Sequence, residues 1–590
     1  MGKTFIEKAL GAPSGSIVFK KPDILLTHDN TASIMKTFEK AGGKKIADPD
    51  QLLVVLDHNA PPTNAKLATD YKAVREFVKQ QGIKKFYDAG KGICHQIMSY
   101  HAKPGMIIVG SDSHTCTAGA FNALAAGIDR TEAAGIYKTG ETWFRVPESI
   151  KITLNGKLPK GVYSKDLSLW IIGMIGSAGA NYMSVEYHGE GVKTLGMADR
   201  MTIANLASEM GAKNAVFPPD KTLVDFYKKK KIKGVWADRD AVYTREITIN
   251  LDDIVPLVAV PHHVDNVKAV AGVKGIKLHQ GLIGTCTNGR LEDIKTAAKI
   301  LKGKKVAKDF QLLIIPASEK IYLKAMEQGY IASLVKAGAV ILSSSCGPCL
   351  GTGQGIPADG DVIISTANRN FKGRMGNKNA EIYLASPATV AKSAIKGEIV
   401  PPEKQEKQAV LPFQKKEGKS LSVPPDENRK TNGVWNYADA DNLNTDQMFA
   451  GNLTYNVLSS DAEAIKPHLF KGFDENFAEH LQTGDVIVAG HNFGCGSSRE
   501  HPAVGLSHAG VKAVIVKSVN RIFYRSCINQ GLPLIVHPEA AKKFQPGDQI
   551  DIQFREGVIK INENTFNFAP LPEKLMQIID KKGLVNYLKG

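Results

Sequence analysis

Four stretches of this chain share one pattern: a short apolar, β-branched run ends in a polar, glycine-rich loop and continues into a helical segment. They are MIIVGSDSHT, DVIISTANRNFKGR, DVIVAGHNFGCGSSREH and VKAVIVKSVNRIFY. Such continuously apolar runs are typical of buried strands in a parallel sheet. The pattern therefore predicts an α/β fold with mostly parallel strands. It also places the polar loops at the carboxyl ends of strands, where open α/β sheets bind ligands.

One boundary divides the chain into a long body and a shorter tail. The stretch from Pro401 to Arg429 carries prolines, is dense in both charge signs and has few periodic apolar positions, which indicates an exposed linker. Weaker breaks near residues 145 and 265 divide the body. We therefore expect α/β units at 1–145, 146–265 and 266–400, a linker at 401–430 and a C-terminal α/β domain at 431–590.

Composition narrows the class of protein. With 590 residues, of which 43% are hydrophobic, the chain can bury several cores. It contains no apolar run long enough to cross a bilayer and begins without a signal pattern, so we expect no membrane partner and a cytoplasmic location. The lysines behind the net charge of +16 are mostly scattered, which favours a solvated surface over a nucleic-acid partner. A basic field also suits an anionic small molecule.

Seven cysteines, an odd number at low density, favour reduced thiols and metal or redox chemistry over a disulfide scaffold. Cys346 and Cys349 lie three residues apart in SSSCGPCLGTGQG, and Cys286 lies in a separate glycine-bearing loop, GTCTNGR. Three thiolates can hold an iron–sulfur cluster with one iron open to substrate. A thioredoxin-like redox pair and a structural zinc site are the alternatives. The first gives Cys286 no role, and the second lacks an evident fourth ligand.

Histidines and acids occur as close pairs in several loops. Asp57–His58 ends the run LLVVL, Asp112 and His114 follow MIIVG, and His28–Asp29 and His95–Gln96 repeat the arrangement, the last with an amide in place of the acid. A carboxylate beside an imidazole fixes its tautomer and raises its basicity, as a proton donor requires. One such pair is typical of a structural hydrogen bond, but four in one body favour catalysis.

Two further loops suit anionic groups. Arg369 and Arg374 lie together in TANRNFKGR, with Asn368 beside them, and paired arginines suit a substrate with several carboxylates. A surface ion-pair network is the alternative. In HNFGCGSSREH, Ser497, Ser498 and Arg499 follow a glycine-rich turn at the expected start of a helix. Amide donors there can stabilise an anion, or the serines can simply cap the helix.

Taken in order, the motifs HDNTAS, LDHNAP, ICHQI, GSDSHT, TIANLASEMGA, GTCTNGR, SSSCGPCLGTGQG, TANRNFKGR and GCGSSREH resemble the aconitase superfamily, which includes aconitase, homoaconitase and isopropylmalate isomerase. The resemblance covers nearly the whole chain. The segment DNLNTDQMFAGNLTYNV is similar to the start of the small subunit of the isopropylmalate isomerase and homoaconitase branch. The resemblance implies a large and a small subunit fused in one chain, with three α/β units around a cluster-binding cleft and a linked, swivelling C-terminal domain.

The resemblance also implies roles for individual residues. It makes Cys286, Cys346 and Cys349 the ligands of one [4Fe–4S] cluster, and Ser497 the base that removes a proton from carbon. Asp57 and His58 protonate the departing hydroxyl. His95 with Glu209, and Asp112 with His114, are supporting acid–base pairs. Asn205 and Asn368 contact the cluster or its bound water. It implies that the substrate carboxylates are held by Arg369, Arg374, Arg499, Ser113 and Ser498, and that His28, which stands where aconitases carry glutamine, also binds substrate.

The implied reaction is dehydration of a small di- or tricarboxylate and rehydration with the hydroxyl moved. Citrate and isocitrate are the first expectation, with homoaconitase and 3-isopropylmalate dehydratase substrates as the alternative. Aconitases often place an arginine in the small-domain loop for the third carboxylate, but the stretch MFAGNLTYNV contains none. We expect a monomer or small homo-oligomer. RNA binding as a second role remains a further alternative, which steep salt dependence of RNA affinity would reveal.

Overall fold

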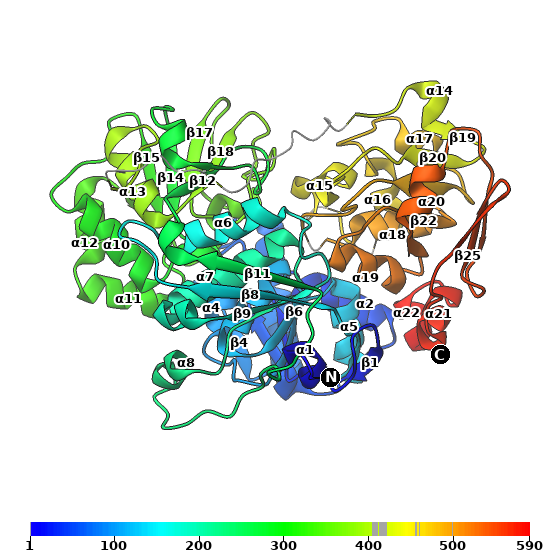
Figure 1. Cartoon of the computed structure of the whole chain (residues 1–590), viewed down its shortest axis with the longest axis horizontal. Helices are drawn as coiled ribbons and strands as arrows, with labels where there is room; N and C mark the ends of the chain where they lie inside the picture. The colour runs from blue at the N-terminus through cyan, green and yellow to red at the C-terminus, as the bar shows by residue number, and fades with distance from the viewer. Residues whose placement is uncertain are drawn as a thin grey trace.

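The computed structural model describes residues 2–403, 411, 422–454, 457–459, 461–497 and 499–589. Figure 1 shows a body formed by the blue, cyan and green parts of the chain and a tail, yellow to red, beside it. The expected linker falls largely on residues outside this description. Its last part is α14 (Asp426–Arg429), which leads into the tail.

The first sheet of the body is parallel and carries most of the candidate loops. Its five strands lie in the order β4 (Lys85–Tyr87), β3 (Leu52–Val55), β2 (Ile24–Thr27), β5 (Ile107–Gly110) and β6 (Leu124–Gly127). The strands β2 and β3 are buried throughout, as their continuous apolar runs predict. Because β3, β2, β5 and β6 are neighbours, the loops that follow them meet at one sheet edge. Helices α2 (Thr31–Lys40), α3 (Ala65–Gln81) and α5 (Arg130–Thr139) belong to this unit.

A second parallel sheet continues the body. Its order is β10 (Asn214–Val216), β9 (Ser184–His188), β8 (Ser149–Asn155) and β11 (Arg245–Asn250). Helices α6 (Ser164–Ile175) and α7 (Met197–Leu206) pack against each other nearby. One cluster of buried side chains runs from the first sheet at Leu26, through Ile150 of the second, to Leu282 of the third. A shared core therefore fixes the three sheets relative to one another.

The third sheet is mixed and supplies the cysteine loops. Its seven strands lie in the order β13 (Val267–Ala269), β12 (Leu257–Ala259), β18 (Glu381–Ala385), β17 (Val362–Ser365), β14 (Gln280–Ile283), β15 (Gln311–Ile314) and β16 (Val340–Ile341). The strand β12 is antiparallel to both its neighbours, and the remaining pairs are parallel. Since β12 precedes residue 266, the third sheet begins earlier than our expected third unit. The division at 145 and 265 stays a prediction.

The tail has its own mainly parallel sheet. Its order is β19 (Lys430–Thr431), β20 (Val434–Tyr437), β21 (Val486–Ala489), β22 (Ala513–Val516) and β23 (Leu534–Val536), with only β19 antiparallel. An antiparallel sheet of β24 (Ile550–Gln553), β25 (Val558–Ile561) and β26 (Asn564–Asn567) forms its outer edge (Figure 1). The fold is therefore α/β in body and tail, as the sequence predicts.

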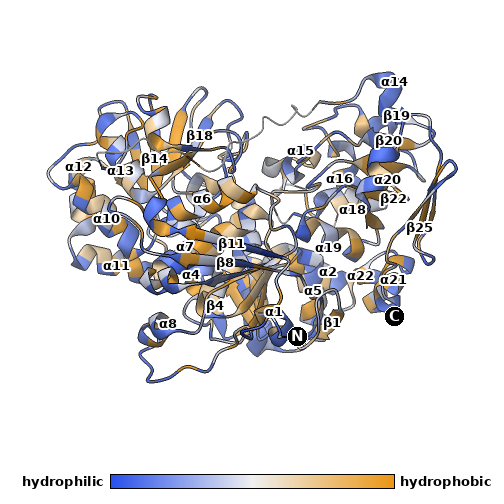
Figure 2. Ribbon diagram, viewed as in Figure 1, coloured by the Kyte–Doolittle hydropathy of each residue, from blue (hydrophilic) through white to orange (hydrophobic). Residues whose placement is uncertain are grey.

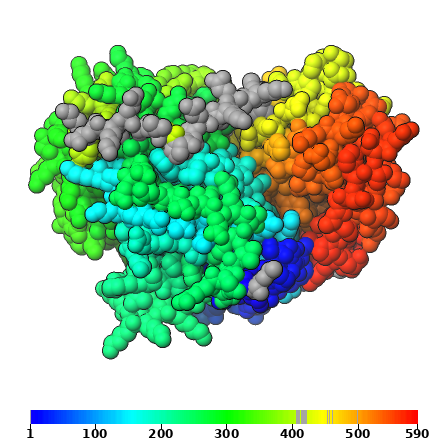
Figure 3. Space-filling model, in the orientation of Figure 1, coloured from blue at the N-terminus to red at the C-terminus, as the bar shows by residue number. Residues whose placement is uncertain are grey.

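Hydropathy follows burial in both parts. Figure 2 shows apolar residues concentrated on the strands and on one side of many helices, with hydrophilic residues toward the outside. In Figure 3 the red C-terminal region lies against the blue N-terminal region on the visible face. None of the helices in the described ranges combines the length and apolar character that a membrane crossing requires.

Helix α19 (Arg521–Asn529) joins the tail to the body through buried polar contacts. The Arg525 guanidinium forms an ion pair with Glu132 of α5, and both side chains are 1% exposed. Arg525 also lies over the Trp143 ring, 3.6 Å from its centroid. At the start of the helix, Arg521 donates to the Ser113 carbonyl at 2.8 Å. These contacts hold the tail against the first sheet of the body.

Removing Arg525 tests this attachment. The substitution Arg525→Met leaves the Glu132 carboxylate buried without its cation, so we expect the free energy of unfolding to fall by about 3–5 kcal/mol. Arg555→Met is the matched control, because Arg555 pairs with Glu573 and Asp580 while 55% exposed. It should cost no more than about 1 kcal/mol. Chemical denaturation followed by circular dichroism measures both, and equal effects would contradict the assignment.

Candidate functional site

Polar loops of the body and two loops of the tail meet at one cavity. Of the residues predicted for the site, those that line the cavity are His28, His58, His95, Asp112, Ser113, His114, Cys286, Cys346, Cys349, Asn368, Arg369, Arg374, Ser497 and Arg499. Asp57, Asn205 and Glu209 lie behind this wall, each hydrogen-bonded to one of its members. Ser498 falls outside the described residues. The structure thus brings together loops separated by more than 400 positions in the sequence.

Three cysteine thiols share this cavity. Cys286 lies in α9 (Thr285–Asn288), directly after β14, while Cys346 precedes and Cys349 lies within the short helix η7 (Gly347–Leu350). Two donors are directed at sulfur: Asn368 Nδ2 lies 3.3 Å from Cys286 Sγ, and Arg374 Nη2 lies 3.6 Å from Cys349 Sγ. Such donors stabilise negative charge on thiolate.

The donor set fits an iron–sulfur cluster. Burial raises the pKa of the Cys286 thiol to about 12, so a bound cation is needed to keep it ionised. Three soft sulfur ligands at one cavity are typical of iron–sulfur binding, and a count of three leaves one iron for substrate. All seven cysteines are free thiols. Since Cys286 shares the cavity with Cys346 and Cys349, the redox-pair alternative does not account for the arrangement.

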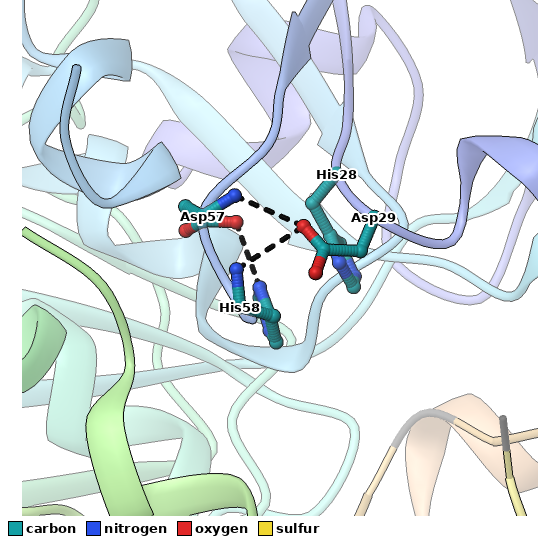
Figure 4. Close-up of side chains that lie close together, drawn as sticks. All are labelled: His28, Asp29, Asp57 and His58. Carbon is teal, nitrogen blue, oxygen red and sulfur yellow. Dashed lines mark hydrogen bonds and ion pairs between the residues drawn. The ribbon is translucent and has the colours of Figure 1, made fainter. Parts of the chain in front are cut away.

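Asp29 fastens the loop that carries Asp57 and His58 (Figure 4). Its Oδ1 accepts hydrogen bonds from the backbone amides of Asp57 at 2.9 Å and His58 at 3.1 Å. Its Oδ2 accepts from the Asn59 amide at 2.9 Å and the Tyr71 hydroxyl at 2.6 Å. Donors from four residues on one buried carboxylate fix the direction in which Asp57 and His58 point. Asp29 is therefore a positioning residue.

The His28 ring does not pair with Asp29, the next residue in the sequence. Its ring stacks on His58 with centroids 3.9 Å apart (Figure 4), and Nε2 lies 3.3 Å from the Ser111 carbonyl. Its Nδ1 is buried with no hydrogen-bond partner among the described residues, so Asp29 does not fix the tautomer. Burial, aided by the charge of His58, lowers the pKa of His28 to about 3. A neutral imidazole therefore faces the cavity.

His58 lies between two carboxylates. Its Nδ1 donates to Asp57 Oδ1 at 2.8 Å, and its Nε2 lies 3.6 Å from Asp112 Oδ2. Asp57 Oδ2 in turn accepts from the Cys94 amide at 2.7 Å. Burial lowers the pKa of His58, but Cys346, Asp57 and Asp112 together hold it well above its usual value. His58 therefore carries a proton at neutral pH.

Asp112 joins three histidines. Its Oδ1 accepts from His95 Nε2 at 2.7 Å and from the His114 amide at 2.8 Å, while His58 faces Oδ2. Burial raises the pKa of Asp112, but the hydrogen bonds from His114, His58 and His95 outweigh it and hold the pKa well below its usual value. Asp112 is therefore ionised and can balance a positive charge on His58.

The structure changes one of the two pairs that the resemblance implied. His95 pairs with Asp112 and not with Glu209, and Glu209 pairs instead with His114, whose Nε2 lies 2.7 Å from Glu209 Oε1. Asp112 keeps a contact with His114, whose Nδ1 lies 3.5 Å from Asp112 Oδ1. The reason is the backbone path. The helix α4 (Cys94–Met98) brings His95 to the end of β5, and η2 (Ser113–Phe121) directs the His114 ring toward η4 (Ala207–Met210).

Arg369 links the acid–base residues to the loop after β17. Its Nε donates to Glu209 Oε2 and its Nη2 to Ser113 Oγ, both at 3.0 Å. Burial raises the pKa of Glu209, but Arg369 and His114 outweigh it and lower the pKa to about 2. A buried, ionised Glu209 thus holds His114 on one side and Arg369 on the other.

The tail contributes Ser497 and Arg499 after β21. Thr445 is the first residue of α15 (Thr445–Met448). Its Oγ1 lies 3.1 Å from Ser497 Oγ and accepts a hydrogen bond from the Ser497 amide at 3.0 Å. Arg499 Nη1 donates to Asp446 Oδ1 at 2.8 Å and to the Phe449 carbonyl at 2.6 Å. The segment beginning NTDQMF therefore positions both residues.

Sequence reasoning missed Lys165 of α6, which is 0% exposed. Its Nζ donates to the carbonyls of Thr366 at 3.1 Å and Ala367 at 2.6 Å, directly before Asn368 and Arg369. The lone lysine in the helical run SKDLSLWIIGMI was the signal that could have found it. Arg130 was also missed, although it follows the strand run LAAG and lines the cavity.

Lys165→Met tests how far this lysine holds the Asn368 loop. The change leaves two buried carbonyls without their donor, so we expect the free energy of unfolding to fall by roughly 2–4 kcal/mol. Lys151→Met is the control, since Lys151 pairs with the 59% exposed Glu246 on the surface. Denaturation midpoints measure both variants. A loss for Lys165→Met no larger than that of the control would contradict the role.

Comparisons with known proteins agree with this geometry. The Aconitase family (aconitate hydratase) model matches residues 4–274 and 268–397, and the Aconitase C-terminal domain model matches residues 430–539. The chain is 45% identical over 414 residues to the 3-isopropylmalate dehydratase large subunit 1 of Methanopyrus kandleri, which covers 68% of this chain and 99% of the relative. It is 47% identical over 388 residues to the probable methanogen homoaconitase large subunit of Methanosarcina mazei, covering 65% and 98%.

One solved structure is similar to a quarter of the chain. It is the 3-isopropylmalate dehydratase of Methanocaldococcus jannaschii, 38% identical, covering 25% of this chain and 87% of its own, with a TM-score of 0.23. The two family models together span the body and most of the tail. The chain belongs to the aconitase family and is an enzyme of the aconitate hydratase type.

Proposed function

We propose that this protein is a [4Fe–4S]-dependent hydro-lyase that moves a hydroxyl between adjacent carbons of a 2-hydroxy di- or tricarboxylate. The observation that carries the proposal is the meeting of three thiols, histidine–carboxylate pairs and four arginines at one cavity. Relatives named homoaconitase and 3-isopropylmalate dehydratase support the substrates of those enzymes over citrate and isocitrate, our first expectation.

The cluster would be held by Cys286, Cys346 and Cys349, with Asn368 and Arg374 donating toward sulfur. When bound, it supplies a Lewis-acidic iron that makes hydroxide a better leaving group. Asn205 holds the Asn368 side chain in place, because Asn205 Oδ1 accepts a hydrogen bond from Asn368 Nδ2 at 3.4 Å.

Proton movement is assigned to residues on opposite parts of the chain. His58 holds the proton that a departing hydroxyl needs, and Asp57 and Asp112 stabilise its charged form. Ser497, from the tail, removes a proton from carbon in this proposal, with the Arg499 cation two residues away to favour its alkoxide. Acid and base thus come from the body and the tail, so the substrate lies between them.

Arginine side chains bind the carboxylates. Arg369, Arg374 and Arg499 all line the cavity, and guanidinium groups can bind carboxylates with two parallel hydrogen bonds. Ser113 Oγ, held by Arg369, is a further donor. Ser498 keeps the substrate-binding role that the resemblance implies only as a prediction.

Cys286→Ala tests the cluster. After anaerobic reconstitution with iron and sulfide, we expect the variant to lose the charge-transfer absorbance and most of the bound iron, because two thiolates hold a cluster poorly. Cys527→Ala is the control, since Cys527 is also a free thiol but does not line the cavity. Iron and sulfide content measure the result. Normal loading of Cys286→Ala would exclude it as a ligand.

Ser497→Ala separates base catalysis from cluster binding. The variant should keep the absorbance of the reconstituted enzyme but lose roughly 10²–10⁴-fold in kcat, the usual contribution of a positioned base. The assay follows homocitrate, 3-isopropylmalate, citrate and isocitrate. Unchanged kcat would remove Ser497 from the base role, and the absence of turnover in the reconstituted parent enzyme would overturn the proposed function.

A further inference from the structure

Arg290 closes the motif GTCTNGR that carries Cys286, and its guanidinium turns back onto the Cys286 backbone. It stands at the start of α10 (Leu291–Leu301) and is 4% exposed. A cation is disfavoured at the start of a helix, because the macrodipole is positive there. The helix α10 therefore does not account for a buried arginine at this position, whereas the contacts of the guanidinium do.

The guanidinium binds carbonyl groups of the short helix α9. Its Nη2 donates to the Cys286 carbonyl at 3.0 Å, and its Nη1 donates to the Thr287 carbonyl. Nη1 also donates to Thr202 Oγ1 of α7 at 3.2 Å, and this hydroxyl donates to the same Thr287 carbonyl at 2.9 Å. The last carbonyls of a helix have no partner within it, and a basic side chain can supply one. Arg290 thus binds the backbone of Cys286 and of the residue after it.

The turn that Arg290 holds is strained. Thr285, directly before Cys286, has a φ of +66°, a left-handed conformation that β-branched residues rarely adopt. Such strain persists only where the surrounding contacts impose it, and it is typical of functional sites. Arg290 holds the turn after Cys286, and the Thr366 hydroxyl holds it before, where it accepts from the Gly284 amide at 2.9 Å. Loss of either contact would let the turn relax and move the Cys286 side chain.

The same turn is joined to the segment that carries Asn368. Thr287 Oγ1 donates to the Thr366 carbonyl at 2.7 Å, and Asn368 Nδ2 lies 3.3 Å from Cys286 Sγ. A displaced turn would therefore change both the direction of the Cys286 thiol and its distance from this hydrogen-bond donor.

The Arg290 guanidinium also places a positive charge behind the thiol. Its three acceptors are two carbonyls and a hydroxyl, none of which carries a charge. The carboxylate of Asp293, in the first turn of α10, binds the Arg290 amide and Asn288 Nδ2, both at 3.0 Å. A buried cation beside a cluster ligand favours the more negative state of a cluster, since net charge is one of the factors that set its reduction potential.

We propose that Arg290 is a positioning residue for the iron–sulfur cluster: by binding the Cys286 and Thr287 carbonyls it holds the Cys286 side chain in the direction that retains the cluster, and its charge raises the reduction potential. The inference rests on the cluster binding of the proposed function. A guanidinium presents several donors in one plane and can bind two adjacent carbonyls at once, whereas the lysine ammonium group carries the charge without that geometry. Arg290→Gln and Arg290→Lys therefore separate geometry from charge.

The test measures iron retention and reduction potential after anaerobic reconstitution with iron and sulfide. We expect Arg290→Gln to release iron to a chelator about 10–100-fold faster than the parent enzyme, the usual loss when a residue behind a metal ligand is removed. Its reduction potential, from a titration followed by electron paramagnetic resonance, should lie below that of the parent enzyme. Arg290→Lys should keep the parental potential and release iron at an intermediate rate.

Arg200→Gln is the matched control. Arg200 is also a buried arginine, 0% exposed, and its guanidinium binds the carbonyls of Leu195 at 3.2 Å and Val192 at 3.0 Å. It lies two residues before Thr202 in α7, and so on the opposite side of that helix. The variant should lower the free energy of unfolding but leave iron release and reduction potential unchanged.

Thr202→Val is a second variant with a milder change. It removes the hydroxyl that lies between the Arg290 guanidinium and the Thr287 carbonyl, so it should also speed iron release, by less than Arg290→Gln. Its iron release decides the question if Arg290→Gln does not fold.

Parental iron release or an unchanged potential in Arg290→Gln would overturn the inference and leave the hydro-lyase function standing. Parental iron release in Thr202→Val, where Arg290→Gln does not fold, or equal effects for Arg200→Gln, would do the same. A parent enzyme that binds no cluster would overturn both. A parent enzyme that binds the cluster but turns over none of the substrates would overturn the function alone, because iron release does not depend on turnover.

Discussion

The buried ion pair between Arg525 and Glu132 decides whether this protein has a complete site. Ser497 and Arg499 come from the tail, and the thiols and histidines come from the body, so the chemistry depends on how the two are docked. Glu132 and Arg525 are both almost inaccessible to water, and Trp143 covers the guanidinium. Such a pair is costly to break from one side only, which makes the docked arrangement well defined.

Within the site, most buried charges are held by more than one partner. Asp29 accepts hydrogen bonds from four residues, Asp112 contacts three histidines, and Glu209 binds both His114 and Arg369. The low dielectric constant of the protein interior strengthens these hydrogen bonds and raises the free-energy cost of leaving a polar group unpaired. The network therefore fixes protonation states as well as positions. The result is a charged imidazole at His58 beside a neutral one at His28, stacked ring on ring.

The sequence predicted the α/β class and most of the residues that line the cavity, because strand ends and motif loops are local features. It did not predict which histidine pairs with which acid, since His114 and Glu209 are 95 positions apart and meet only through the packing of η2 on η4. Lys165 lies near the start of an apolar helical run, a pattern that predicts a buried helix and not a site residue. The pattern around Arg130 predicts only the first residue of an ordinary helix. The stretch MFAGNLTYNV contains no arginine, but Arg130 of the body lines the cavity.

The hydrogen bond from Arg521 to the Ser113 carbonyl links the position of the tail to the acid–base residues of the body. The same guanidinium nitrogen also reaches Ser208 Oγ at 3.0 Å, so one tail arginine lies beneath both segments that carry the acid–base residues His114 and Glu209. If the tail moves away to admit substrate, this support leaves together with Ser497. An open enzyme would then lack its base, and the segments that carry His114 and Glu209 would be less well supported. Water that enters the open site would therefore meet a centre that cannot carry out the proton transfers.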